Sequence, residues 1–284
     1  MSARKVVIVT DREMEAKMLE HTYANHSHYT HAFEDDVEVV TPEGRLIGRL
    51  FPGVLSDKAL GYAYAHINTI KTRITSRGSV VGKNSMMPRI NPNGSLSEVN
   101  EVPRVVSNLC GYSDTIGYLG PSRLFPMGRL SSYTKAHQKA RPELTPVLRQ
   151  IDDIVFHEYP AAHAWQAEGF PGNDVYNWYD QVGDQTGFSS CYGNVNVRSA
   201  YHRDAHNLGG SLSALFTMGN YEGGGLVIPR FGVCFELQPA DLLLFHGDDI
   251  HGVLPFKGNR CSGVFFSAAK YDDLWQEVEL IDTD

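Results

Sequence analysis

The sequence predicts an α+β protein with a double-stranded β-helix core of the jelly-roll or cupin type, buttressed by upstream helices. Short segments rich in Val, Ile, Leu, Phe and Cys, separated by Gly, Pro, Asn and Asp, fill residues 186–270. Closely spaced strands of this kind are typical of an antiparallel sandwich or barrel. Patterns with helical spacing precede them, in residues 58–185. A β-core covered by these helices is the economical arrangement.

The N-terminal part is predicted to be a strand followed by a polar segment. Residues 6–9 are apolar and read as a strand, and residues 12–36 are polar. The polar segment contains His21, His26, His28 and His31. Their spacing fits no helix or hairpin, which favours a solvated surface over a metal site. We expect residues 1–57 to form this N-terminal part and residues 58–284 a larger region that contains the helices and the β-core, both packed as one compact unit.

Two helices and a loop are expected in the middle of the chain. Ser56 has the chemistry of an N-cap, and a helix is predicted from there to about residue 78. Its apolar face comprises Leu60, Tyr64, Ile67, Ile70 and Ile74. A loop rich in Pro, Asn and Gly should follow over residues 82–103. A second helix is predicted from Pro142 until Pro160 ends it, with a short helical piece continuing through Trp165.

Seven strands are expected after residue 186. Each is a short apolar run bounded by turn-forming residues. The predicted strands are residues 194–197, 212–217, 225–228, 234–237, 241–245, 252–255 and 261–268.

The composition indicates a soluble intracellular protein. No run of about 18 apolar residues is present, and the N-terminus turns polar at Thr10, too soon for a signal peptide. The four cysteines are scattered, which favours reduced thiols over a disulfide scaffold or a zinc site. We therefore expect no membrane partner.

The charge is unevenly distributed along the chain. The formal net charge is -8, yet residues 58–149 carry 13 basic and only 4 acidic side chains. This basic third is compatible with one face of a groove for a polyanion. It is equally compatible with the solvated surface of a helix and a loop, and charge alone leaves both readings open.

A metal site is predicted within the β region. His202 and Asp204 are two residues apart, so on an extended strand end both side chains face the same side. His251 follows several strands later. Two histidines and one carboxylate on one face of an iron leave coordination positions open for dioxygen and a bidentate cosubstrate. The prediction is a non-haem Fe(II) centre.

Arg260 and Ser262 add a site for a dicarboxylic keto acid. A guanidinium matches the fork of a distal carboxylate, and a serine hydroxyl can donate to the same group. The expected cosubstrate is 2-oxoglutarate.

Other histidines remain possible competing sites. His246 forms a local cluster with Asp248 and Asp249, and His157 and His163 flank a predicted turn.

These motifs resemble the oxygenase domain of the TET/JBP family. The resembling stretches are NVNVRSAYHRDAHN at 194–207, GNYEGGGLVIP at 219–229, ADLLLF at 240–245, HGVLP at 251–255 and RCS at 260–262, with VSNLCGYSD at 106–114 and GRLSSYT at 128–134 upstream. The resemblance covers roughly residues 100–270, and the compact fungal and bacteriophage members are the most similar in size. Enzymes of this family oxidise the methyl group of 5-methylpyrimidines in nucleic acid.

The resemblance implies further roles. Arg129 would contact the C1 end of 2-oxoglutarate, Asn194 or Asn196 would face substrate or cosubstrate, and His206 would contact the substrate or a metal ligand. The implied partner is DNA containing 5-methylcytosine, and the implied product is 5-hydroxymethylcytosine. We expect the protein to act as a monomer. The base would flip out of the duplex to reach the site. Aromatic residues that could stack on it, although core packing is the commoner role, are Tyr192, Tyr201, Phe216 and Trp178.

The sequence departs from the family in two respects. Some compact relatives carry an acidic residue where His206 or Asn207 falls, and the cysteine-rich zinc-binding insert of animal members is absent. Three alternatives therefore stay open. They are a 2-oxoglutarate oxygenase of protein side chains or small metabolites, a relative that uses ascorbate, and a jelly-roll protein that binds without turnover.

Overall fold

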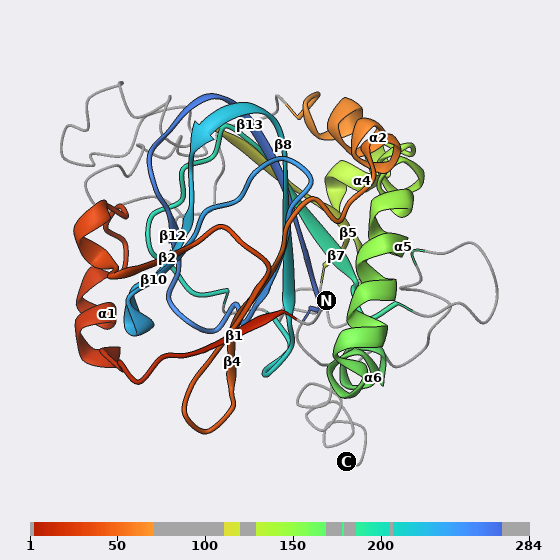
Figure 1. Cartoon of the computed structure of the whole chain (residues 1–284). Helices are drawn as coiled ribbons and strands as arrows, with labels where there is room; N and C mark the ends of the chain where they lie inside the picture. The colour runs from red at the N-terminus through yellow and green to blue at the C-terminus, as the bar shows by residue number, and fades with distance from the viewer. Residues whose placement is uncertain are drawn as a thin grey trace, which may run out of the picture.

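The computed structural model describes residues 3–70, 111–119, 129–168, 178, 186–204 and 207–268, and Figure 1 shows how their elements are arranged. The helices are α1 (Glu13–Leu19), α2 (Asp57–Ile67), α4 (Ser132–Ala136), α5 (Ala140–Glu158) and α6 (Pro160–Glu168), with the 3-10 turns η1 (His26–His28) and η5 (Pro229–Phe231). The strands are β1 (Arg4–Val7), β2 (His31–Phe33), β3 (Val37–Val40), β4 (Leu46–Phe51), β5 (Tyr112–Leu119), β6 (Arg129–Leu130), β7 (Ser190–Val195), β8 (Ser213–Gly223), β9 (Leu226–Ile228), β10 (Val233–Phe235), β11 (Leu242–Phe245), β12 (Gly252–Val253) and β13 (Phe256–Phe266).

Two sheets form the core. The larger has nine strands in the order β1-β3-β4-β11-β8-β13-β7-β5-β6, and the smaller has four in the order β12-β9-β10-β2. The long strands β8 and β13 are antiparallel neighbours at the centre of the larger sheet. The chain crosses repeatedly between the two sheets, as a double-stranded β-helix requires. The predicted α+β class and core type are confirmed.

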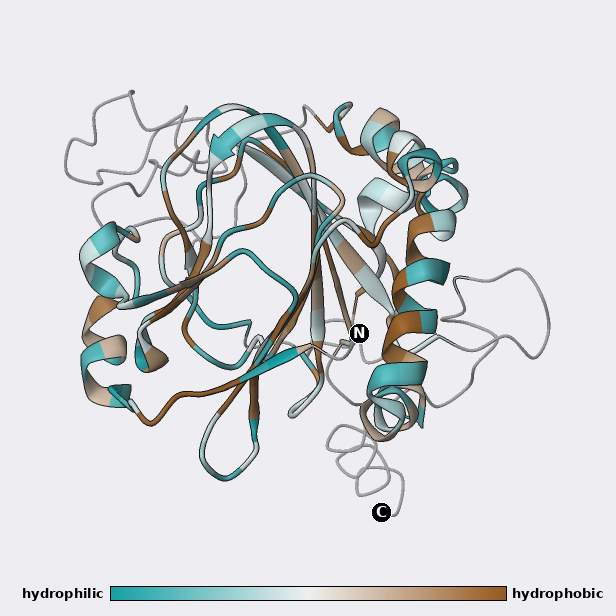
Figure 2. Ribbon diagram, in the orientation of Figure 1, coloured by the Kyte–Doolittle hydropathy of each residue, from teal (hydrophilic) through white to brown (hydrophobic). Residues whose placement is uncertain are grey.

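Helices cover one face of the larger sheet. Figure 1 places α2, α4, α5 and α6 along the β5, β7, β8 and β13 side, and Figure 2 shows an apolar stripe along α5. The stripe arises because Leu144, Val147, Leu148 and Ile151 recur at helical spacing. They share one apolar cluster with sheet residues such as Phe265. The opposite face of the larger sheet is thereby left for the smaller sheet.

The space between the two sheets is a second apolar layer. In β10, Val233 and Phe235 join the cluster that includes Leu243 of the larger sheet. Cys234, between them in sequence, faces the other way and packs with Ala16 of α1. This alternation is the period-2 pattern of a strand with two buried faces. The inter-sheet space is where the pocket described below opens.

All seven strands predicted after residue 186 are present, with bounds shifted by a few residues. The helix capped by Ser56 also forms, since the Ser56 side chain accepts from the Ala59 N–H at 3.4 Å. It ends at Ile67, before the predicted end, and residues 71–78 of the predicted helix, with Ile74, lie outside the described residues. The predicted loop at 82–103 lies outside the described residues. The helix after residue 140 and the helical piece through Trp165 are confirmed as α5 and α6.

The prediction for the N-terminal part was incomplete. The predicted first strand appears as β1, but the polar segment contains α1 and β2, and two unpredicted strands, β3 and β4, follow. β4 pairs with β11, so the N-terminal part continues the larger sheet. Short strands such as β2 pair with distant segments, and local sequence patterns do not contain that information. Within the described part of the chain, none of the helices is both long and apolar enough to cross a membrane.

Candidate functional site

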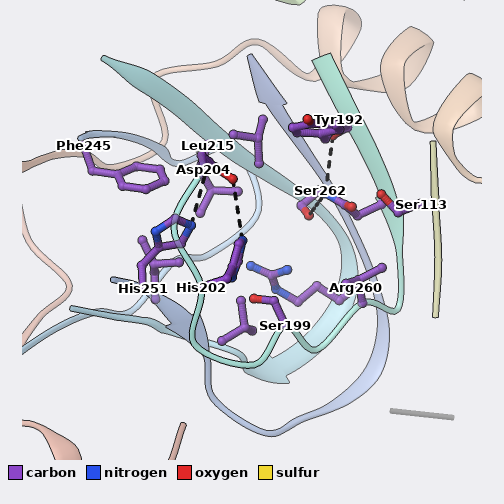
Figure 3. A pocket seen from close by; sticks show the side chains of 15 residues that line it. Ser113, Tyr192, Ser199, His202, Asp204, Leu215, Phe245, His251, Arg260 and Ser262 are labelled. Atoms are coloured by element: carbon purple, nitrogen blue, oxygen red, sulfur yellow. Dashed lines mark hydrogen bonds and ion pairs between the residues drawn. The ribbon is translucent and has the colours of Figure 1, made fainter. Parts of the chain in front are cut away.

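A pocket opens between the two sheets, and Figure 3 shows the side chains around it. Both sheets and the segments that join them contribute to its walls. The lining residues are Ser113, Tyr192, Asn194, Val197, Ser199, His202, Asp204, Leu215, Leu226, Phe245, His251, Val253, Arg260, Ser262 and Val264. The two histidines and the carboxylate lie at one end, and Arg260 reaches toward them from β13.

His202, Asp204 and His251 form a compact group of possible metal ligands. One ligand atom from each lies within 4.8 Å of the others. His202 Nε2 is 3.7 Å from Asp204 Oδ1, and His251 Nε2 is 3.9 Å from Asp204 Oδ2. In the part of the chain that the structure describes, three or more such residues come together nowhere else. The group could hold one metal ion on a single face.

The two imidazoles are held in the form that a metal requires. His202 Nδ1 is 2.8 Å from the main-chain oxygen of Ala200, and His251 Nδ1 is 2.9 Å from that of Asp249. A carbonyl can only accept, so each Nδ1 carries the proton. Each Nε2 then presents its lone pair to the cavity, as in metal sites where the other ring nitrogen is anchored.

Main-chain pairing brings the three residues together. His202 and His251 form an isolated antiparallel bridge, with N–H to O=C distances of 3.0 Å in both directions. The Asp204 N–H donates to the Gly247 carbonyl at 2.9 Å. A Cβ on Gly247 would lie 3.0 Å from Asp204 Oδ2, a contact tighter than most real ones. A glycine therefore lets the loop approach the carboxylate closely.

Arg260 is a buried cation whose hydrogen-bonding capacity is incompletely used. The residue is 3% exposed, and its Nε and Nη2 atoms have no hydrogen-bond partner among the described residues. The rings of Tyr221 and Phe256 flank its guanidinium at 5.4 and 5.7 Å. Burial lowers the pKa of Arg260, but a guanidinium keeps its proton. An anion entering the pocket would supply the missing partners.

Strand register places Ser262 and Asn194 beside Arg260. Arg260, Ser262 and Val264 alternate along β13 and all line the pocket, as the period of a strand requires. Ser262 pairs with Asn194 of β7, which in turn pairs with Ser113 of β5. Ser113 is 9% exposed, and its hydroxyl has no hydrogen-bond partner within the described part of the chain. These groups make one end of the pocket polar.

Two of the sequence-predicted residues lie elsewhere. Arg129 begins β6 and pairs with Leu119, at the opposite end of β5 from Ser113. It is not among the described residues that line the pocket, so the structure does not place it at the cosubstrate position expected of it. The resemblance carried no strand register and could not locate it.

Asn196 is a structural residue rather than a pocket residue. Its backbone is left-handed, with φ 54°, and its side-chain oxygen accepts from the Arg260 N–H at 2.8 Å. Its own N–H donates to the Arg260 carbonyl at 2.8 Å. Asn196 therefore holds the main chain of Arg260 where the regular ladder ends, and of the two predicted asparagines only Asn194 lines the pocket. His206 lies outside the described residues.

The competing histidines contact other groups, away from the cavity. His246 Nδ1 contacts the Ser211 carbonyl at 3.1 Å, and burial lowers its pKa. His157 is exposed beside Asp153, and His163 lies 3.2 Å from Asp152 in the helical layer.

The aromatic candidates divide in the same way. Tyr192 lines the pocket, stacked on Phe266 at 4.4 Å between ring centroids. Trp178, Tyr201 and Phe216 are at most 2% exposed and belong to the core. Ser113 was not predicted as a pocket residue, although it lies in the resembling stretch 106–114. That stretch was the only signal in the sequence that could have pointed to it.

The described residues fit a metal with an anionic cosubstrate. The donor set is two histidines and one carboxylate, the set associated with non-haem Fe(II) oxygenases. The unpartnered Nε and Nη2 of Arg260 fit a carboxylate, because a buried unpaired charge is costly and a guanidinium binds carboxylates in a fork geometry. Both features open into the same cavity.

Comparison with known proteins gives one family. The model of the Tet_JBP family, described as the oxygenase domain of the 2OGFeDO superfamily, matches residues 110–269. "Thymine dioxygenase JBP1" of Leishmania major is 24% identical over 257 residues, covering 88% of this chain and 28% of that protein. The JBP1 of Trypanosoma brucei brucei is 24% identical over 267 residues, covering 91% of this chain and 28% of that protein. The chain thus spans less than a third of these relatives.

A solved structure shares the fold. "NgTET1 in complex with 5mC DNA" superposes with a TM-score of 0.60 at 12% identity, covering 98% of this chain and 90% of that chain.

Proposed function

The chain belongs to the Tet/JBP family of 2OGFeDO oxygenases, as its motifs predicted, and on this premise we propose that it hydroxylates the 5-methyl group of 5-methylcytosine in DNA. The family's cofactors are Fe(II) and 2-oxoglutarate. The observation that carries the proposal is the joint cavity, in which the His202, Asp204 and His251 group faces the partly unsatisfied guanidinium of Arg260.

The polar residues of the pocket that were predicted from the sequence have separate roles in this proposal. His202, Asp204 and His251 hold the metal, and Arg260 with Ser262 holds the distal carboxylate of 2-oxoglutarate. Asn194 lies beside Ser262, with its Nδ2 3.4 Å from the serine hydroxyl. It therefore orients that hydroxyl or contacts the bound molecule directly. Arg129 is given no task in the proposal, because it is not among the described residues that line the cavity.

The metal and the keto acid together supply the activation of dioxygen and the oxidation of a bound methyl group. The protein contributes orientation and a dry surface. Leu215, Phe245 and Val264 line the cavity with apolar atoms, which exclude water and prevent side reactions. The Nδ1 contacts to main-chain carbonyls orient both imidazoles so that their Nε2 atoms are directed at one point.

The family and one aromatic residue of the pocket support a methylated base in DNA as the substrate. A methyl group of a duplex base is reached when the nucleotide flips into an enzyme pocket, which costs a few kcal/mol of unstacking. Tyr192 is the described aromatic residue of the four sequence candidates that borders the cavity, so it is the candidate to stack on the base. A solved structure of the same fold holds 5mC DNA, and this supports DNA as the partner.

Thymine is the second candidate substrate. The curated relatives are named thymine dioxygenases, and thymine and 5-methylcytosine carry the same methyl group on the same ring carbon. They differ on the ring edge that forms hydrogen bonds with the partner base in a duplex. A matched pair of DNA substrates therefore separates the two.

Nucleoside mass spectrometry tests the proposal. The full chain is incubated with Fe(II), 2-oxoglutarate and DNA that contains 5-methylcytosine, alongside the same DNA without the modification. We expect 5-hydroxymethylcytosine, one oxygen atom heavier than its precursor, in the methylated sample alone and only when 2-oxoglutarate is present. The His202→Ala variant should form none.

Other products would redirect the assignment. If 5-hydroxymethyluracil appears instead, the substrate is thymine. If succinate accumulates while both DNAs stay unchanged, the cofactors stand and the substrate is a protein side chain or a metabolite. Turnover with ascorbate in place of 2-oxoglutarate would contradict the role of Arg260, and DNA binding without any turnover would indicate a non-enzymatic protein.

A further inference from the structure

The loop between β11 and β12 contains a buried carboxylate that the proposed reaction does not use. Asp249 is 4% exposed, and it lies two residues before His251 in this loop. Its main-chain oxygen is 2.9 Å from His251 Nδ1. The main chain of Asp249 therefore sets the direction in which His251 presents Nε2 to the cavity.

Two arginines from distant segments hold the Asp249 carboxylate. Arg45 Nη2 donates to Oδ2 at 2.7 Å, and Arg230 Nη1 is 3.6 Å from Oδ1. Arg45 lies in the hairpin between β3 and β4, and Arg230 lies in η5. Removing one partner of a buried ion pair leaves an uncompensated charge. The two pairs therefore fix the carboxylate, and with it the main chain that carries the carbonyl.

The arginines are themselves held in place. Arg230 donates from Nε and Nη2 to the two carboxylate oxygens of Asp11, at 2.9 and 2.7 Å. The Phe231 ring lies 5.9 Å from the Arg45 guanidinium carbon and 5.1 Å from that of Arg230. A bidentate contact and a ring face restrict a guanidinium more than a single ion pair does. The network thus connects the N-terminal part of the chain to the loop.

We propose that Asp249, held by Arg45 and Arg230, is a positioning residue for His251, so that the N-terminal part of the chain sets the metal affinity of the site. This inference rests on the proposed role of His251 as a metal ligand. His202 is anchored differently, because its Nδ1 contacts Ala200, whose main chain pairs with Tyr23 in a β-bridge. Removing the Asp249 charge should therefore act first on His251, and on His202 only through the main-chain bridge between the two histidines.

Calorimetric titration of the metal-free full chain with Mn(II) tests the inference without turnover. Asp249→Asn keeps the size of the side chain and removes the charge that the arginines hold. We expect the Mn(II) dissociation constant to rise by about 10-fold or more, the effect typical of groups that orient metal ligands. Asp36→Asn is the matched control, because Asp36 also pairs with an arginine, Arg49 of β4, and neither residue is among the described residues that line the pocket. It should leave the Mn(II) affinity unchanged.

Arg45→Gln is a second, milder variant, since the Arg45 side chain is 39% exposed. It should weaken Mn(II) binding in the same direction. Because Arg45 acts through Asp249, the double variant should bind Mn(II) no more weakly than Asp249→Asn alone. Fully additive losses in the double variant would overturn the proposal.

A purely structural role would give a different result. Asp249→Asn would then lower the thermal midpoint of the metal-free protein while the folded protein bound Mn(II) like the unsubstituted chain, and the positioning role would be wrong. If the unsubstituted chain itself binds no Mn(II), the metal site and this inference are both wrong.

Discussion

Arg260 combines a charge, deep burial and two guanidinium nitrogens that have no hydrogen-bond partner among the described residues. The Arg260→Gln variant should raise the KM for 2-oxoglutarate by about 10- to 100-fold, because hydrogen bonds to a charged group contribute about 1.5–3 kcal/mol. Succinate formation measured against 2-oxoglutarate concentration gives this value. Lys257→Gln is the matched control, a cation of the same strand that is exposed, and its KM should not change. An unchanged KM in Arg260→Gln would contradict the anchoring role.

Asn196 makes a prediction about stability. In Asn196→Ala, the main-chain N–H of Arg260 loses the side-chain oxygen that accepts from it. The alanine also keeps the left-handed backbone of this position without a side-chain hydrogen bond to support it. The free energy of unfolding should fall by about 1–3 kcal/mol, measured by urea denaturation. Asn196→Asp keeps the acceptor oxygen and should retain most of the stability. Equal losses in both variants would show that the hydrogen bond contributes little.

At the residue scale, the sequence best predicted the residues whose role follows from their type and their spacing along the chain. His202 and Asp204 are spaced for one strand end, and their partners His251 and Arg260 follow in the order that the motif requires. The structure brings all four to one cavity. Arg129 and Asn196 show what local chemistry omits, because the side of a strand that a residue faces depends on register and bulges.

At the scale of elements, β13 connects the site to the helical layer. Its Arg260 and Ser262 face the pocket, whereas Gly263 faces Phe216 of β8 so closely that a Cβ would lie 2.2 Å from the ring. Gly263→Ala should lower stability by about 1–3 kcal/mol through overpacking. Thermal unfolding checks this, and Gly209→Ala is the control, since a Cβ there meets no atom of the described part of the chain within 4 Å. Similar midpoints for both variants would contradict the tight contact.

His66 makes the stability of the helical layer depend on pH. Its Nδ1 is 2.9 Å from Glu143 Oε2, and Nε2 is 3.1 Å from the Tyr133 hydroxyl. Burial, the largest effect, lowers the pKa of His66, and Glu143 opposes it. The unfolded chain therefore takes up the proton first as pH falls below about 6.5. The free energy of unfolding should decrease over this range and stay level above it.

Urea denaturation across the range from neutral to about pH 5.5 measures this dependence. His66→Gln should make the dependence shallower without abolishing it, because burial also lowers the pKa of His28 and His246. A variant with the same pH dependence as the unsubstituted chain would exclude His66 as a cause.

Whether a strand was predicted depended on its apolar run and not on the distance to its partner. β11 is recognisable by a continuous apolar run between turn formers. β4 pairs with β11, but Gly48 and Arg49 interrupt its apolar run. The pattern alone did not separate it from the polar segment before it. The end of α2 was also missed, because Ile70 continues the apolar spacing of the helix after the helix has ended at Ile67.

For the whole molecule, the N-terminal part is integral to the core. We propose that residues 1–57 and the oxygenase region fold as one unit. β3 and β4 supply Val37, Val39, Ile47 and Leu50 to the inter-sheet core. Deleting residues 1–57 would remove them and expose the edge of β11, which favours aggregation.

The deletion is tested against a shorter one. We expect the chain without residues 1–57 to be insoluble or unfolded by circular dichroism. Deletion of residues 1–9 removes only the edge strand β1 with its neighbour Ile8, and that chain should fold with reduced stability. A soluble, folded protein after the longer deletion would contradict the single-unit proposal.

The central claim is that Fe(II) and 2-oxoglutarate occupy the cavity together. Anaerobic equilibrium binding of 2-oxoglutarate, with and without Fe(II), tests it most directly in the unsubstituted chain and in Asp204→Ala. The proposal predicts that the unsubstituted chain binds 2-oxoglutarate tightly only when Fe(II) is present, and that Asp204→Ala loses this dependence together with the tight binding. Equal binding with and without the metal, or an Asp204→Ala variant that behaves like the unsubstituted chain, would contradict it.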